Sequence, residues 1–205
     1  MKASKSVGKR GLQTRRRNPI VLYAAEGVNK TEKIYLQNFQ GRNRPRILSA
    51  SGNWTDPEKM MNQLIKEAKD MGLSVRDGDR AFCLVDTDTK KEKQAQIDAA
   101  CRKETDLVRV ITSSPCIEEW FLCHFRMSTG YHTSTAAVNE LKERCPGYKK
   151  NSNIYPLIKD KEAAAIQNAR CLEQFHLEQG RGVHSVASNP SSEIYKVVEF
   201  LNKSR

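Results

Sequence analysis

Short, mainly apolar runs stand out in the first half of the chain, at 20–25, 80–85 and 107–111. A run of this length without strict alternation of apolar and polar residues is typical of a strand that is buried on both faces of a sheet. We predict strands in these three segments and expect a shorter strand at 47–50.

Apolar residues at helical spacing separate and follow these runs. One such segment starts at Thr55-Asp56-Pro57, where a capping side chain precedes a proline that suits the first helical turn. The predicted helices span 32–39, 57–71, 91–103, 113–125, 135–144, 160–179 and 191–203. Strands that alternate with helices are typical of an α/β fold with a mostly parallel central sheet flanked by helices. No further strand is predicted after Arg126, so we expect a mainly helical C-terminal part.

The positive charge of the chain is concentrated near its N-terminus. The formal net charge is +11, and seven of the 35 basic residues lie within residues 1–17, which contain no acidic residue. We expect 1–17 to be a flexible basic arm and 18–205 to form a single domain. An overall basic chain favours nucleic acid as a partner. A basic arm often contacts nucleic acid and as often serves only solubility.

Composition argues against membrane-spanning, secreted and zinc-finger proteins. No segment approaches the roughly 20 consecutive apolar residues of a membrane span, and the N-terminus lacks the apolar core of a secretion signal. We therefore expect a cytoplasmic protein with no membrane partner. The six cysteines form no Cys-x-x-Cys pair and have no histidine at zinc-finger spacing, so free packed thiols are expected. The oligomeric state stays open, and a homo-oligomer is one of the alternatives.

Acidic residues directly follow two of the predicted strands. Glu26 ends the first run, and Asp86 and Asp88 follow 80–85. Ligand sites form at the carboxyl edge of parallel sheets, and residues i and i+2 of an extended chain point to the same side, so Asp86 and Asp88 are suited to share one ion. Such oxygen ligands favour Mg²⁺ or Mn²⁺. The alternative is that each acid only caps a loop or a helix.

Several motifs around these acids carry a resemblance to a known family. They are Ala25-Glu26-Gly27 with Lys30-Thr31-Glu32 and Tyr35, then Val85-Asp86-Thr87-Asp88, the segment 113–125 around Glu118, Gly147-Tyr148-Lys149-Lys150, Asn168-Ala169-Arg170, and 189–195. In these motifs the chain resembles the RloB-like proteins over about residues 18–203. The resemblance implies a Toprim-like fold, the metal-dependent domain of topoisomerases, primases and nucleases. It also implies a role in antiviral defence or abortive infection beside an ATPase of the ABC/SMC type.

The resemblance also implies roles for single residues. It implies catalytic roles for Glu26, Asp86, Asp88 and Glu118, and metal ligation by Glu26, Glu32, Asp86 and Asp88. For Glu118 the alternative is a simple stabilising position in the first turn of a helix. Lys90 stands where topoisomerase-like Toprim domains often carry a third acid, which argues against a topoisomerase.

Basic residues near the motifs are the candidates for binding nucleic acid. They are Lys30, Arg42, Arg44, Lys149 and Lys150. The neighbouring Tyr148 is a candidate for stacking on a base, with a solvated loop as the alternative. The function we expect is metal-dependent hydrolysis of phosphodiester bonds in DNA or RNA, tRNA included, with one metal ion or two. The alternative is a non-catalytic partner of the ATPase that binds nucleic acid or a nucleotide.

Overall fold

The computed structural model describes residues 17–26 and 31–204 of the chain. Its elements are β1 (Ile20–Ala25), α1 (Thr31–Gln37), β2 (Arg46–Ser49), α2 (Pro57–Asp70), η1 (Val75–Asp77), β3 (Arg80–Asp86), α3 (Lys93–Cys101), β4 (Val108–Ser114), α4 (Glu118–Cys123), α5 (Ser134–Arg144), α6 (Tyr155–Ile158), η2 (Lys159–Lys161), α7 (Glu162–Glu178), β5 (Ser191–Ser192) and α8 (Ile194–Lys203). The fold is α/β with a mainly helical C-terminal part, as the sequence predicts. No helix in the described ranges is long and apolar enough to cross a membrane.

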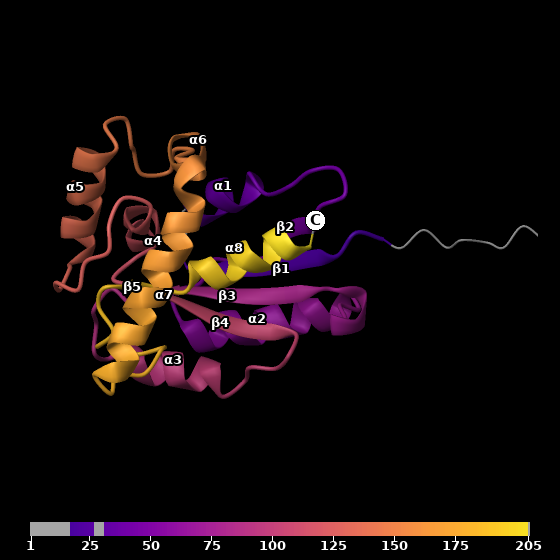
Figure 1. The fold of residues 1–205 in the computed structure, drawn as a ribbon. Helices are drawn as coiled ribbons and strands as arrows, with labels where there is room; N and C mark the ends of the chain where they lie inside the picture. The colour runs from indigo at the N-terminus through magenta and orange to yellow at the C-terminus, as the bar shows by residue number, and fades with distance from the viewer. Residues whose placement is uncertain (1–16, 27–30, 205) are drawn as a thin grey trace, which may run out of the picture.

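The sheet has the strand order β2-β1-β3-β4-β5. The first four strands are parallel, and β5 is antiparallel to β4. The register pairs Ala24 with Cys83 and Cys83 with Val110, so β1, β3 and β4 end at the same edge. In Figure 1 the chain enters β1 from the right, and the shared carboxyl edge lies on the side of α4 and α5.

Helices cover both faces of the sheet (Figure 1). Val21 and Tyr23 of β1 belong to the core formed with α1, α4, α7 and α8. Their neighbours Leu22 and Ala24 point to the opposite face and pack with α2 and α3. Strands covered on both faces bury most of their side chains, which explains the mainly apolar runs.

The start of the predicted helix at 113–125 is wrong, because β4 extends to Ser114 and α4 begins at Glu118. Ser113 and Ser114 pair with Ser192 and Ser191 of β5. A two-residue strand of serines has no apolar pattern, so neither this strand nor the longer β4 could be predicted from periodicity.

Arg17 is bound to the domain, although its place in a basic segment predicts a flexible arm. Its guanidinium donates to both carboxylate oxygens of Asp79, at 2.8 and 2.6 Å. The buried Asp79 also accepts the backbone N–H groups of Ile20 (2.8 Å) and Ser74 (2.9 Å). Burial opposes ionisation of Asp79, but these hydrogen bonds outweigh it and hold its pKa below the ordinary value. The rest of the expected arm, 1–16, lies outside the described residues.

The Asp79→Ala variant is expected to lose about 2–4 kcal/mol of unfolding free energy, measured by urea denaturation. The variant leaves the N–H groups of Ile20 and Ser74 without their acceptor, and each unpaired group costs about 1–3 kcal/mol. Asp77→Ala is the matched control, because Asp77 contacts the same Arg17 at 3.4 Å from a side chain that is 54% exposed. That control is expected to lose less than about 1 kcal/mol. Equal losses in both variants would show that the buried acceptor is not the cause.

Candidate active site

Acidic residues from separate segments meet in one pocket at the carboxyl edge of the sheet. This pocket, called the acidic pocket below, has a volume of about 180 Å³. It is lined by Glu26, Thr55, Asp86, Asp88, Cys116, Glu118, Ser134, Val138 and Lys150. The parallel register explains the convergence, since β1 ends next to Glu26 and β3 ends at Asp86.

The chain turns sharply between Asp86 and Asp88. Asp86 is the last residue of β3, whereas Asp88 and Thr89 have φ angles of 50° and 58°, in the left-handed region. The backbone N–H of Asp88 donates to the carbonyl of Pro115 at 2.9 Å, which fixes the turn. The two aspartates therefore line the same pocket from a turn and not, as expected, from one side of an extended strand. A left-handed threonine is rare and costs of order 1–2 kcal/mol, and such strain often marks functional sites.

Crowding and burial shift the pKa values of three of the acids upward. Burial raises the pKa of Glu26 to about 6, against the opposing effect of Lys93. Burial, with a contribution from the charge of Glu118, raises the pKa of Glu32 to about 7. The pKa of Asp86 lies well above its ordinary value, first because of burial and then because of the charges of Glu32 and Glu118. These acids are therefore close enough to disfavour one another's ionisation.

Lys93 is a site residue that the sequence pattern did not predict. Its Nζ donates to Glu26 Oε2 at 2.7 Å and to Asp88 Oδ2 at 3.3 Å, and it also donates to the backbone carbonyl of Asp86. Lys93 lines a second space of about 240 Å³, called the lysine hollow below. The lysine hollow is lined by Glu26, Thr55, Asp88, Lys90, Glu92, Lys93 and Gln96. The only sequence signal was a lysine at the start of the helix that follows the acidic turn.

Glu118 is fixed by a hydrogen bond inside the protein. It is 1% exposed, and Oε1 accepts the hydroxyl of Tyr148 at 2.8 Å. Tyr148 is itself buried, so the expectation that its ring is free to stack on a base is wrong. Lys149 and Lys150 are both exposed, and Lys150 also lines the acidic pocket.

The residues that form this site lie within a segment that matches a known protein family. Residues 21–201 match RloB, described as RloB-like protein. The chain belongs to the RloB-like family. No curated protein and no solved structure matches it. All the residues that line the acidic pocket of this RloB-like protein fall inside the matched segment, and the basic residues 1–16 fall outside it.

Two of the other predicted nucleic-acid contacts of the RloB-like protein, Arg42 and Arg44, do not line the acidic pocket. Arg42 and Arg44 precede β2, and Arg46 at the start of β2 pairs with Ile20 at the start of β1. They therefore lie toward the amino edge of the sheet, where Asn18 also donates to the carbonyl of Arg44. These arginines follow the first helix closely in the sequence, but that closeness does not indicate on which edge of the sheet they lie. Lys30 lies outside the described residues.

The oxygen atoms around the acidic pocket suit a divalent cation in their chemistry. Glu26 Oε1 and Glu32 Oε2 are buried and have no hydrogen-bond partner among the residues that the structure describes. Carboxylate oxygens are the preferred ligands of Mg²⁺ and Mn²⁺. Among the residues that the structure describes, no three His, Cys, Asp or Glu side chains are arranged as a group able to hold a metal ion. Ligation by these acids therefore requires their side chains to turn toward a common point.

A basic groove continues from the acidic pocket toward α5. Its volume is about 340 Å³, and it is lined by Ser134, Thr135, Val138, Asn139, Lys142 and Lys150. Ser134, Val138 and Lys150 line both spaces, so the groove and the pocket are adjacent. Two lysines thus lie along one route that leads to the acids.

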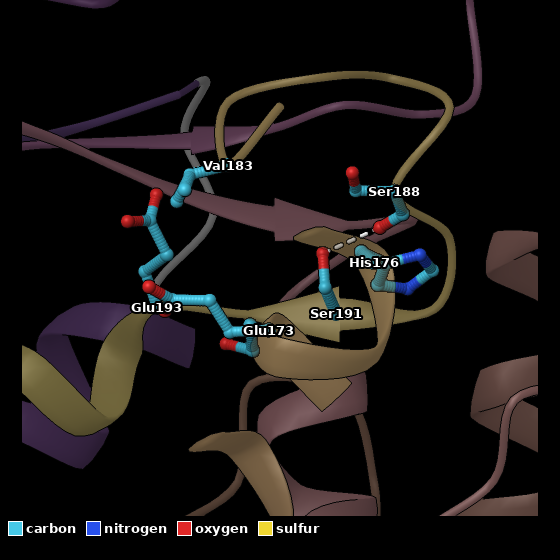
Figure 2. A pocket seen from close by; sticks show the side chains of 7 residues that line it. Glu173, His176, Val183, Ser188, Ser191 and Glu193 are labelled. Carbon is cyan, nitrogen blue, oxygen red and sulfur yellow. Dashed lines mark hydrogen bonds between the residues drawn. The ribbon is translucent and has the colours of Figure 1, made fainter. Parts of the chain in front are cut away.

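A cavity beside β5 has a structural role in this RloB-like protein. Figure 2 shows it between Glu173, His176, Val183, Ser188, Ser191, Ser192 and Glu193. Its volume is about 10 Å³, roughly enough for one water molecule. Glu193 accepts the N–H and the hydroxyl of Thr112, at 3.0 and 2.8 Å, and lies 2.6 Å from Lys196. Burial opposes its ionisation, but His184 and Lys196 lower its pKa to about 2. Through these contacts Glu193, in the 189–195 motif, links the start of α8 to β4.

Proposed function

We propose that this RloB-like protein is a metal-dependent nuclease that hydrolyses phosphodiester bonds. One observation carries the proposal: carboxylates from three chain segments, at Glu26, Asp86 and Glu118, line one pocket at the carboxyl edge of a parallel sheet. Crowded carboxylates are costly without a cation, and a divalent ion offsets that cost. The adjacent basic groove gives a polyanion a favourable approach to the acids.

The proposed mechanism assigns distinct tasks to the residues of the site. Glu26, Glu32, Asp86 and Asp88 would hold Mg²⁺ or Mn²⁺, and the ion would stabilise charge on the reacting phosphate. Glu26 would serve either as a ligand of the ion or, where it does not bind the ion, as the group that accepts and returns a proton, since burial raises its pKa to about 6. Lys150 would face the phosphates at the junction of pocket and groove.

The direct test is cleavage by the purified full chain. The substrates are single-stranded and duplex DNA and RNA, tRNA included, each with Mg²⁺, with Mn²⁺ or with excess EDTA. We expect cleavage with at least one of the ions and none with EDTA. Nucleic-acid binding without cleavage of any substrate would instead favour the alternative, a non-catalytic partner of an ATPase.

We also propose that this activity serves antiviral defence together with an ATPase of the ABC/SMC type. The resemblance of the motifs to the RloB-like family supports this part of the proposal. Phage plating efficiency is expected to fall on cells that express the protein together with an ATPase encoded by a neighbouring gene. It is not expected to fall on cells that express the Asp86→Asn variant with the same ATPase. Equal protection by wild type and the variant would show that defence does not depend on the acidic pocket.

The Lys142→Ala and Lys150→Ala variants are expected to bind single-stranded nucleic acid more weakly and with less salt dependence. Each lost phosphate contact lowers the slope of log K against log salt by about 0.7. Fluorescence anisotropy at several salt concentrations measures this slope. Lys69→Ala is the control, since Lys69 is exposed in the last turn of α2, which leads to the amino edge. The same loss of slope in Lys69→Ala would argue against the groove as the binding route.

A further inference from the structure

Lys93 places a positive charge among the oxygens of the acidic site. Its ammonium contacts Glu26 Oε2 at 2.7 Å, Asp88 Oδ2 at 3.3 Å and the carbonyl oxygen of Asp86. The side chain is only 7% exposed. Two carboxylates and a carbonyl around one cation are the kinds of ligand that a divalent ion takes in proteins. Lys93 therefore fills a place that is chemically suited to a metal ion.

The backbone around Lys93 holds this charge in position. The N–H of Thr87 donates to the carbonyl of Ser113, and the N–H of Asp88 donates to that of Pro115, both at 2.9 Å. The turn is continued by the N–H of Lys93, which donates to Lys90 at 3.0 Å. The turn is thus tied to the end of β4, and it delivers Lys93 as the first residue of α3. The position of the Lys93 ammonium is therefore fixed by the fold, unlike that of a lysine on the surface.

Glu26 separates the lysine hollow, in which Lys93 lies, from the acidic pocket, which Lys93 does not line. Its Oε2 accepts the hydrogen bond from Lys93, whereas its buried Oε1 has no partner in the described ranges 17–26 and 31–204. Lys93 lines the lysine hollow and is not among the residues that line the acidic pocket, whereas Glu26 and Asp88 line both. Glu32, 6% exposed, also has a buried oxygen with no partner in the described part of the chain, and its charge acts on Asp86. In the described part of the chain, the carboxylates that Lys93 leaves to a metal ion are therefore those of Glu26, through Oε1, of Glu32 and of Asp86.

We propose that Lys93 takes the place of a second metal ion, so that the site binds one divalent cation instead of two. The ion would lie in the acidic pocket with Asp86, and the ammonium would remain in the lysine hollow. Two-metal sites hold their ions about 3.5–4 Å apart, bridged by shared ligands. Glu26 and Asp88, which line both spaces, are the residues placed to bridge Lys93 and the ion. This inference rests on the proposed function and sets the metal stoichiometry of that site.

The test is to count Mn²⁺ ions bound by the metal-stripped full chain, using electron paramagnetic resonance and titration calorimetry. Wild type is expected to bind one ion. Lys93→Met is expected to bind two, with the spin coupling of neighbouring Mn²⁺ ions in the resonance spectrum. Lys93→Arg, which keeps the charge, is expected to bind one. Lys90→Met is the matched control, because Lys90 lies 4.0 Å from Asp88 and is 61% exposed, and it is also expected to bind one.

Several outcomes would overturn the inference. Two coupled ions in wild type would show that Lys93 does not replace one, and a single ion in Lys93→Met would show that its removal opens no second position. Lys93→Gln gives the same comparison with a polar side chain should the methionine variant not fold. If wild type binds no Mn²⁺ at all, the metal-dependent function itself fails. Cleavage that depends on two ions would overturn only the inference.

Discussion

Replacing Asp86 with asparagine is expected to abolish metal-dependent cleavage and to stabilise the metal-free protein. The loss of activity should be about 1,000-fold or more, because a metal ion supplies several kcal/mol of transition-state stabilisation and each 1.36 kcal/mol is a factor of ten. The gain in stability has a separate cause. Burial and the charges of Glu32 and Glu118 hold the pKa of Asp86 well above its ordinary value. A neutral amide removes that unfavourable charge, and we expect a gain of about 1 kcal/mol or more near pH 7.

Two measurements test this pair of effects on the same Asp86→Asn protein. Cleavage is followed with Mg²⁺ or Mn²⁺, and thermal unfolding is followed with EDTA. Asp88→Asn is the control for stability, since Asp88 is 37% exposed and paired with Lys93, so that its replacement should not stabilise. An Asp86→Asn protein that is inactive and less stable without metal would indicate damage to the fold rather than loss of a ligand.

The second large effect is a dependence of stability on pH that comes from Glu26 and Glu32. Burial raises their folded-state pKa values from 4.5 to about 6 and about 7. Between pH 4.5 and about 7 these two carboxyl groups therefore bind more protons in the folded protein than in the unfolded chain, so their contribution to stability falls as the pH rises. One pKa unit corresponds to about 1.4 kcal/mol, so the two residues together cost a few kcal/mol by pH 7.

The measurement compares wild type with the Glu26→Gln, Glu32→Gln double variant across this pH range without metal. The quantity to compare is the difference in unfolding free energy between the two proteins. Burial lowers the pKa of His124 to about 4, which shifts stability in the opposite direction, but it does so in both proteins and cancels in the difference. The unfolding free energy of the double variant should rise steadily relative to that of wild type from pH 4.5 to 7. Mn²⁺ should stabilise wild type more at pH 7 than at pH 5 and should have little effect on the variant. A constant difference between the two proteins would contradict the raised pKa values.

The sequence predicted the parts of the site that depend on pattern. The apolar runs at 20–25 and 80–85 identified two buried parallel strands, and the ends of these strands placed Glu26 and Asp86 at one edge of the sheet. The pattern could not predict Lys93, because the position of this lysine depends on left-handed backbone at Asp88 and Thr89. Neither residue is a glycine, which would have indicated such a turn.

Other misses have similar physical causes. The burial of Tyr148 depends on a hydroxyl contact with Glu118, which lies 30 residues away, and no local pattern reports such a contact. The two-residue β5 has no periodicity to detect, although it decides where β4 ends. Nucleic-acid binding by Arg42 and Arg44 stays a prediction, and the sequence could not indicate on which edge of the sheet they lie, because the register of β2 with β1 fixes that edge.

The pairing of β5 with β4 has a consequence for the order in which the site is completed during synthesis. Ser113 at the end of β4 holds the Thr87 N–H and also meets Ser192, which lies 79 residues later. Glu193 fixes Thr112 on the same strand. The edge that carries the acids is thus fully braced only after the ribosome has added the segment around 192. A nascent chain stopped before that point would carry the acids without their brace.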